Sequence, residues 1–261
     1  MNNKPITTGG RSVRFERIRS RSQSCSAITV LELMVVIAII ALLSALAVPA
    51  IRGLTRSNTI SSANRQLLDD IALARQRAIN ERSIVHIVFV PTNVANLQAF
   101  PPHPSAERDR KVLTNLWTGA QVRYALFAER SAGDQPGQHH SRYLTGWHSL
   151  PEGVFISEST LDRLERVHDV PFPTVNGNRY DLPHIAFDLS GAIVDTNGVR
   201  RTEGQYLELA RGSIMYQRDP NGGVSYYDVQ ENPPGNSINN YNRIRIDGLT
   251  GRAKVERPEI Q

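Results

Sequence analysis

Cysteine is nearly absent from this sequence, which has one, Cys25, in 261 residues. A single thiol cannot form a disulfide within the chain, so any folded domain must be stabilised by packing. Catalytic motifs are absent too: there is no P-loop, no dinucleotide-type glycine pattern and no Gly-x-Ser-x-Gly. These absences exclude a disulfide-rich secreted scaffold and predict a non-enzyme with neither catalytic residues nor a cofactor.

The net charge of +5 is concentrated at the amino terminus. Residues 1–27 carry six basic side chains and one acidic one, which leaves 24 of each sign in the other 234 residues. A basic segment beside an apolar run stays cytoplasmic under the positive-inside rule. We therefore interpret 1–27 as a basic leader. A disordered tail or a nucleic-acid-binding arm is the alternative, although the neutral remainder argues against nucleic acid as a partner.

The longest apolar run covers 24 residues, 28–51, in which only Glu32 can carry a charge. This length is sufficient to cross a bilayer. A carboxylate in hydrocarbon is energetically costly and is therefore a functional candidate. Two alternatives remain open. One is a secretory signal cut at the small-residue site Ala45-Leu46-Ala47, and the other is a plain membrane anchor in which Glu32 reaches the interface.

The helical pattern continues beyond this run, over residues 52–80. Apolar residues recur there at spacings of three and four and form one stripe: Ile60, Ala63, Leu67, Ile71, Ala74 and Ala78. The pattern predicts one helix over 28–80, apolar all round in its first half and amphipathic in its second. Pro49 removes a backbone hydrogen bond and is expected to kink the helix.

From residue 81 the hydrophobic period changes from 3.6 to 2. A first strand is predicted at 83–90, and turn signals separate further strands at 121–127, 153–157, 184–189, 206–210, 214–218, 224–229, 241–247 and 253–256. A short helix is expected at 161–167. Polar stretches are expected to be loops, at 92–110, 129–149 and 219–240. The prediction is an α+β fold: a long amino-terminal helix, membrane-spanning in its first half, packed on a mainly antiparallel β head of residues 81–261.

Two polar clusters are weaker candidates for binding. Three histidines in or near one predicted loop are possible metal ligands: His139, His140 and His148. Their spacing fits no known metal motif, so we interpret them as a solvated loop without metal. Three arginines at the end of the predicted helix are candidate contacts for DNA phosphate: Arg75, Arg77 and Arg82.

The order of basic leader, apolar run and early glutamate resembles the amino terminus of type IV pilins and type II secretion pseudopilins. The resemblance covers residues 27–51, in which Glu32 is fifth after Ala27 and Pro49 lies at the family's usual distance. The head resembles the H-type minor pseudopilins (GspH/FimT family) in three short segments, at 74–79, 187–191 and 250–255. Ala27 stands where the family usually has glycine, and Ile28 where it usually has an aromatic residue or methionine.

The resemblance implies that prepilin peptidase cuts between Ala27 and Ile28 and that the new amino group of Ile28 is methylated. Glu32 would neutralise the amine of a neighbouring subunit, and Pro49 would belong to the same assembly helix. The implied protein is a structural subunit of a type II secretion pseudopilus or type IV pilus. It would be a single-pass inner-membrane protein with a cytoplasmic amino terminus and a periplasmic head.

Partners are implied in the same way: other pseudopilins or pilins, prepilin peptidase, the inner-membrane assembly platform and membrane lipid. The alternative is a DNA- or ligand-binding minor pilin displayed on a pilus. These expectations divide the chain into a leader at 1–27, a transmembrane and assembly helix at 28–51, its amphipathic continuation at 52–80, and the head.

Overall fold

The computed structural model describes residues 29–90, 116, 118–131, 133–135, 137–138, 140–218 and 224–256. The chain divides into two compact units, Met1–Ala50 and Ile51–Gln261. All described strands belong to the second unit. The predicted leader and the predicted loop at 92–110 lie outside the described residues.

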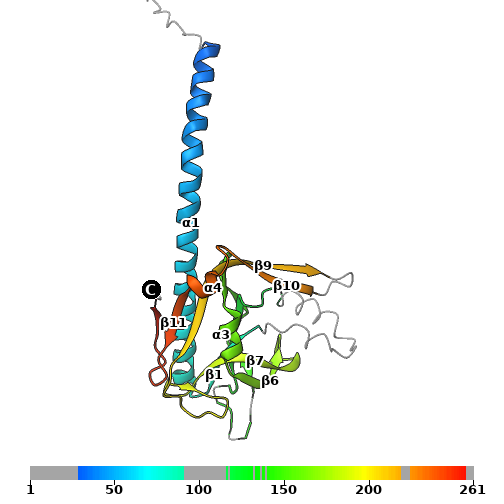
Figure 1. Cartoon of the computed structure of the whole chain (residues 1–261). Coiled ribbons are helices and arrows are strands. Elements are labelled where there is room, and N and C mark those ends of the chain that lie inside the picture. Colours follow the sequence, from blue (N-terminus) through cyan, green and yellow to red (C-terminus); the bar gives the residue numbers. More distant parts are fainter. Residues whose placement is uncertain are drawn as a thin grey trace, which may run out of the picture. The chain divides into compact units, whose positions relative to one another are not determined.

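The first element is a helix of 52 residues, α1, from Val30 to Glu81 (Figure 1). The predicted apolar stripe lies on its second half, and all six of its residues are buried. The burial predicted for Ile60, Leu67 and Ile71 is confirmed, with exposed fractions of 7%, 0% and 0%. Spacings of three and four place these side chains on one helix face, which packs against the strands.

A seven-stranded antiparallel sheet is centred on β1 (Val85–Phe89), with strand order β3-β2-β1-β7-β6. The other strands are β2 (Arg123–Ala128), β3 (Arg142–Tyr143), β4 (His148–Ser149), β6 (Arg166–Phe172), β7 (Asn178–Phe187) and β8 (Ile193–Val194). β4 pairs with β2, and β8 pairs with β7. Ile87 of β1 is opposite Leu126 on one side and Ile185 on the other, so β-branched and aliphatic residues meet across the middle of the sheet.

A five-stranded antiparallel sheet follows, in the order β10-β9-β11-β12, with β5 also paired to β9. Its strands are β5 (Val154–Ile156), β9 (Gln205–Arg218), β10 (Val224–Glu231), β11 (Asn242–Ile246) and β12 (Ala253–Glu256). Two short helices accompany them, α3 (Glu158–Arg163) and α4 (Asn236–Asn239).

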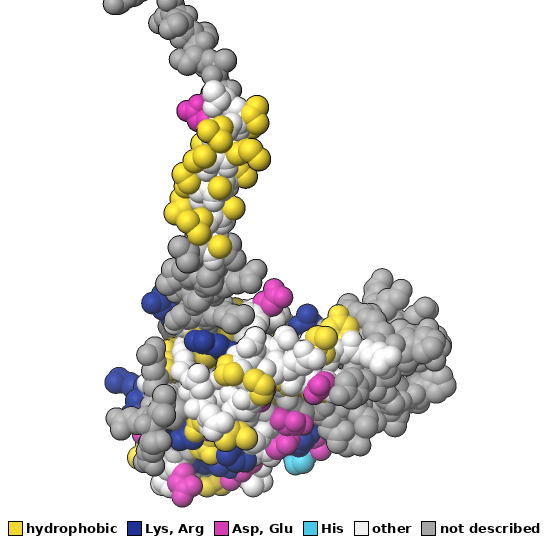
Figure 2. Space-filling view, turned by 45° about the horizontal axis from the view of Figure 1, so that its top comes forward, with side chains coloured by type: hydrophobic (Ala, Val, Ile, Leu, Met, Phe, Trp, Pro, Cys, Tyr) yellow, Lys and Arg dark blue, Asp and Glu magenta, His cyan; other side chains and the backbone are white. Residues whose placement is uncertain are grey.

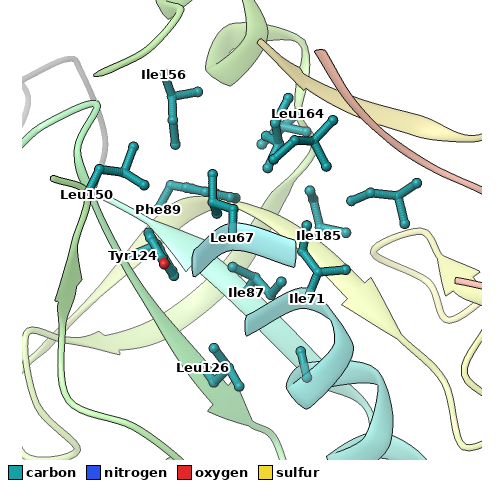
Figure 3. Packing of buried hydrophobic residues seen from close by; sticks show 14 of the residues in the cluster. Leu67, Ile71, Ile87, Phe89, Tyr124, Leu126, Leu150, Ile156, Leu164 and Ile185 are labelled. Atoms are coloured by element: carbon teal, nitrogen blue, oxygen red, sulfur yellow. The ribbon is translucent and has the colours of Figure 1, made fainter. Parts of the chain in front are cut away.

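One hydrophobic core joins α1 to both sheets (Figure 3). It contains Leu67 of the helix, Phe89 of the first sheet and Leu207 of the second. A second cluster covers the opposite face of the first sheet and includes Val88 and Phe127. Because side chains alternate along a strand, β1 contributes to both clusters and is buried on both faces.

Most predicted strands coincide with observed ones, and the differences have local causes. The strands predicted at 206–210 and 214–218 are one strand, β9. Gly212 allows this continuity, because a Cβ there would overlap the Gln230 carbonyl oxygen and the Phe155 ring.

The helix predicted at 161–167 is wrong in its extent: α3 ends at Arg163, and Val167 belongs to β6. The predicted loop at 129–149 contains β3 and β4, and the one at 219–240 contains β10 and α4.

The membrane-spanning segment expected at 28–51 requires correction. Across the part of the chain that the structure describes, no helix combines the length and apolar character needed to cross a membrane. The expected α+β class is accordingly corrected to a mostly β fold of two sheets, and the expected single-pass inner-membrane location is withdrawn.

Candidate functional site

The start of α1 holds Glu32, the charged residue singled out from the sequence. The hydroxyl oxygen of Thr29 accepts a hydrogen bond from the backbone N–H of Glu32 at 3.2 Å. The backbone carbonyl of Thr29 accepts one from Leu33 at 3.1 Å. Thr29 is therefore the N-cap, and Glu32 lies in the first turn, where the helix dipole favours a negative charge. Sequence reasoning missed Thr29, although Thr-x-x-Glu before an apolar run is the pattern of a capping box.

Large apolar side chains surround the helix from its first residue, Val30, to Leu43. Their exposed fractions range from 47% to 77%, and we call them the amino-terminal apolar surface: Val30, Leu31, Leu33, Met34, Val35, Val36, Ile37, Ile39, Ile40, Leu42 and Leu43. Figure 2 shows hydrophobic side chains along the whole length of this segment. Burying one such side chain fully contributes roughly 1.5–3 kcal/mol, so this surface is strongly favoured to associate with other apolar surfaces.

The remaining processing and assembly residues are only partly described. Ala27 and Ile28, between which cleavage is predicted, lie outside the described residues. Pro49 falls within the helical span of α1, and its side chain lies outside the described part. Cleavage, methylation and the role of Pro49 therefore stay predictions.

A polar cluster connects the second half of α1 to the first sheet. The Tyr124 hydroxyl donates to Oδ2 of Asp70 at 2.6 Å, and Nδ1 of His148 lies 3.0 Å from the same oxygen. Gln66 donates to the Tyr124 oxygen at 3.0 Å and to the Ser149 carbonyl at 3.0 Å. Burial and the Asp70 carboxylate raise the pKa of Tyr124, so the hydroxyl remains protonated and donates. The cluster fastens the helix to β2 and β4.

His140 and His148, two of the three candidate histidines, have different carboxylate partners. His139 lies outside the described residues, and His148 belongs to the Asp70 cluster. Nδ1 of His140 lies 2.9 Å from a carboxylate oxygen of Asp134. The pKa of Asp134 is lowered to about 2, mainly because its carboxylate accepts hydrogen bonds from the backbone N–H groups of His140 and Ser131. Within the described ranges, no group of three or more His, Cys, Asp or Glu side chains could hold a metal ion.

A different pair of histidines is buried within the first sheet, on the neighbouring strands β1 and β7. The ring centroids of His86 and His184 are 5.0 Å apart, and the residues are 2% and 1% exposed. Nε2 of His86 lies 2.9 Å from a carboxylate oxygen of Glu129. Burial, followed by the neighbouring His86, lowers the pKa of His184 to about 3, so this ring is neutral near pH 7. No local sequence pattern indicates this pair, because it forms only when β1 and β7 are adjacent.

The arginines considered as DNA contacts are mostly engaged within the chain. Arg75 donates to the Thr250 carbonyl at 2.7 Å, and Arg77 pairs with Glu81 at 3.4 Å. Arg82 is exposed at the end of α1 with a positive φ of 49°. Two of the three guanidinium groups therefore already bind oxygen atoms of the protein, and contact of this set with DNA phosphate stays a prediction.

Comparison of the chain with models of protein families, with curated proteins and with solved structures found no match. The most distinctive feature of the described residues is the contrast between the exposed apolar surface of α1 and its capped, charged first turn.

Proposed function

We propose that this chain is a pilin-like structural subunit, a minor pseudopilin or minor pilin, that assembles with similar subunits through the first half of α1. The observation that supports this most is the amino-terminal apolar surface. A helix that is apolar all round is stable when it is buried, and helices of other subunits provide such burial. Alanine and serine at 38, 41, 44 and 45 permit close approach of two helices.

Glu32 would act in this assembly as a charge that specifies register. A carboxylate among packed apolar helices requires a cation or strong donors. Cleavage after Ala27 would create an amino group on Ile28, four residues before Glu32, and the same group on each neighbouring subunit. A buried polar contact of this kind favours one axial alignment of helices over others, as a polar residue does in a coiled coil.

Processing is tested by co-expression with a prepilin peptidase followed by intact-mass measurement. The proposal predicts loss of residues 1–27 and a methylated Ile28. A chain that begins at Val48 would identify a secretory signal instead, and an uncut chain would contradict the proposed processing.

The role of Glu32 needs a control, because Glu32 also lies in the capped first turn. Glu32→Ala removes the charge, whereas Thr29→Ala weakens the cap and leaves the charge in place. The proposal predicts that Glu32→Ala reduces incorporation into the assembled complex much more than Thr29→Ala does, measured by crosslinking between subunits. Equal losses would mean that Glu32 acts only through the stability of the helix start.

A further inference from the structure

The outer face of the second sheet, which is turned away from the hydrophobic core, carries charged side chains on three adjacent strands. The core-facing side chains of these strands are Leu207, Leu209, Ile244 and Ile246, with Val255 packed against them. Because side chains alternate along a strand, the residues between them project from the outer face. There Arg243 of β11 is opposite Glu208 of β9 and Glu256 of β12, and Arg245 is opposite Lys254. The strand register therefore gathers these side chains on one surface.

Two arginines share the carboxylate of Glu208, and we call them the first cation pair. Nη2 of Arg243 donates to Oε1 of Glu208 at 2.8 Å, and Nη2 of Arg163, in the last turn of α3, donates to Oε2 at 3.2 Å. The central carbon of each guanidinium lies 4.7 Å from the centroid of the Tyr206 ring. The Glu208 side chain is 8% exposed, whereas those of Arg163 and Arg243 are 50% and 36% exposed. Two positioned guanidinium groups thus cover one buried carboxylate and retain one positive charge in excess.

A second cation pair, Arg245 and Lys254, shares the carboxylate of Glu256. Nζ of Lys254 lies 2.8 Å from Oε1 of Glu256, and Nη1 of Arg245 lies 3.9 Å from the same oxygen. The hydrogen bond from Lys254 lowers the pKa of Glu256, so this carboxylate is ionised near pH 7. The cations are again the more exposed groups, and one of their two charges has no acidic counterpart in the pair.

A hollow of about 460 Å³ adjoins the second cation pair. Besides that pair, it is lined by Asp247, Thr250, Arg252 and Ala253. The charges of Arg252 and Asp247 cancel, so the hollow does not alter the balance of the outer face. The two cation pairs hold four cations against two carboxylates, which leaves an excess of two positive charges on this face.

The spacing of the two cation pairs matches the repeat of an extended polypeptide. Arg243 and Arg245 are two residues apart on β11, which corresponds to about 7 Å along the strand. In an extended segment, alternate side chains project from the same side and recur at this distance. Carboxylates at alternate positions of such a segment could therefore reach both cation pairs at once.

We infer that the outer face of the second sheet binds an extended acidic segment of a partner protein, which has carboxylates at alternate positions. Guanidinium groups bind carboxylates through paired N–H donors, and the two arginines of the first cation pair are already positioned. Nucleic acid fits less well, because its binding depends on neutralising many phosphates and residues 28–261 carry as many acidic as basic side chains. The inference does not depend on the proposed assembly through α1.

The test uses the full chain and two fluorescent peptides of equal composition. One alternates glutamate with threonine, and the other has all its glutamates together, followed by all its threonines. At low ionic strength, anisotropy should show severalfold tighter binding of the alternating peptide, because only its spacing matches the two cation pairs. A photoreactive residue in place of its central threonine should label 241–247 and 252–256, as identified by mass spectrometry.

One variant removes a cation from each pair and leaves Glu208 its bond from Arg243. Arg163→Gln with Arg245→Gln should weaken binding of the alternating peptide roughly three- to tenfold. The control Arg77→Gln with Arg179→Gln changes the net charge equally, at side chains that are 51% and 58% exposed, and should have little effect. Circular dichroism and thermal unfolding verify that both variants are folded.

Three results would overturn the inference. The first is equal binding of the two peptides, and the second is equal weakening by the variant and its control. The third is tighter binding of a single-stranded oligonucleotide that has as many phosphates as the peptide has glutamates, if the variant also weakens it. Nucleic acid would then be the ligand of this face.

Discussion

The two halves of α1 carry apolar side chains in different patterns and with different outcomes. From Val30 to Leu43 these side chains surround the helix and remain exposed, whereas from Ile60 to Ala78 they occupy one face and are buried. Both halves are helical, so the difference comes from the side-chain pattern. The sheets of the same chain cover an apolar face that lies on one side of the helix. An all-round pattern exceeds what one sheet face can cover and favours association with other chains.

The largest expected effect comes from deleting a buried side chain of the second half. Leu67→Ala should lower the free energy of unfolding by about 2–5 kcal/mol, because Leu67 is fully buried between both sheets. Leu42→Ala, at a residue that is 66% exposed, should leave it nearly unchanged. Urea denaturation followed by fluorescence measures both. A similar decrease in the free energy of unfolding for both variants would contradict the account in which the second half of α1 packs within the chain and the first half does not.

Acid should destabilise the second unit through His184. The folded-state pKa of His184 is about 3. Burial lowers it most, and the neighbouring His86 lowers it further. Glu129 raises this pKa, and His168 lowers it. An unfolded histidine has a pKa of about 6.5, so between these values the unfolded state binds the proton more readily and stability falls as pH falls. From pH 6.5 to pH 4 the expected loss is roughly 3 kcal/mol.

Carboxylates also titrate in this range, so a variant isolates the histidine contribution. Unfolding free energies of the wild type and His184→Leu should be measured at pH 7 and pH 4. The variant should lose less stability on acidification than the wild type. The same pH dependence in both would show that His184 does not cause the acid sensitivity.

A medium effect is expected where polar groups fasten the helix to the first sheet. Tyr124→Phe removes the hydroxyl that donates to Asp70 and should cost about 1–3 kcal/mol, since it leaves a buried carboxylate with fewer donors. His140→Gln, which changes an exposed contact to Asp134, is the control and should be nearly neutral. Thermal unfolding measures both variants. A neutral Tyr124→Phe would mean that packing alone positions α1.

The smallest expected effect concerns the start of the first half. Thr29→Ala removes the acceptor for the Glu32 N–H and should destabilise the first turn by about 1 kcal/mol, without changing unfolding of the second unit. Thr29→Ser keeps a hydroxyl acceptor and is the control. Hydrogen exchange at Glu32 and Leu33 should accelerate only in the alanine variant. Acceleration in both variants would show that Thr29 does not cap the helix.

Features that depend on local periodicity could be predicted from the sequence. The stripe from Ile60 to Ala78 was identified by its spacing, and β12 has the predicted bounds, because alternation and turn residues are local signals. The β6 strand was missed because a bulge between Val167 and Val170 interrupts the alternation. The bulge shifts later residues to the other face, so the period of 2 is lost within the strand.

Contacts between distant residues could not be predicted. His148 and Asp70 are 78 positions apart and meet only because β4 lies beside α1, and the His86–His184 pair requires β1 and β7 to be neighbours. The length and apolar character of 28–51 also led to a membrane-spanning prediction that the described helix does not support. Periodicity identifies which face of a helix or strand is apolar, but it does not identify which other residues or chains cover that face.

Crosslinking between copies at the amino-terminal apolar surface tests assembly through α1 directly. Val35→Cys in a Cys25→Ser background places one thiol on this surface, where residue 35 is 51% exposed. Glu203→Cys places a matched thiol in an exposed turn of the second unit. With a short bifunctional thiol reagent, assembly through the first half of α1 predicts efficient crosslinking between copies through residue 35 and little through residue 203. Crosslinking at residue 35 no greater than at residue 203 would contradict assembly through the first half of α1.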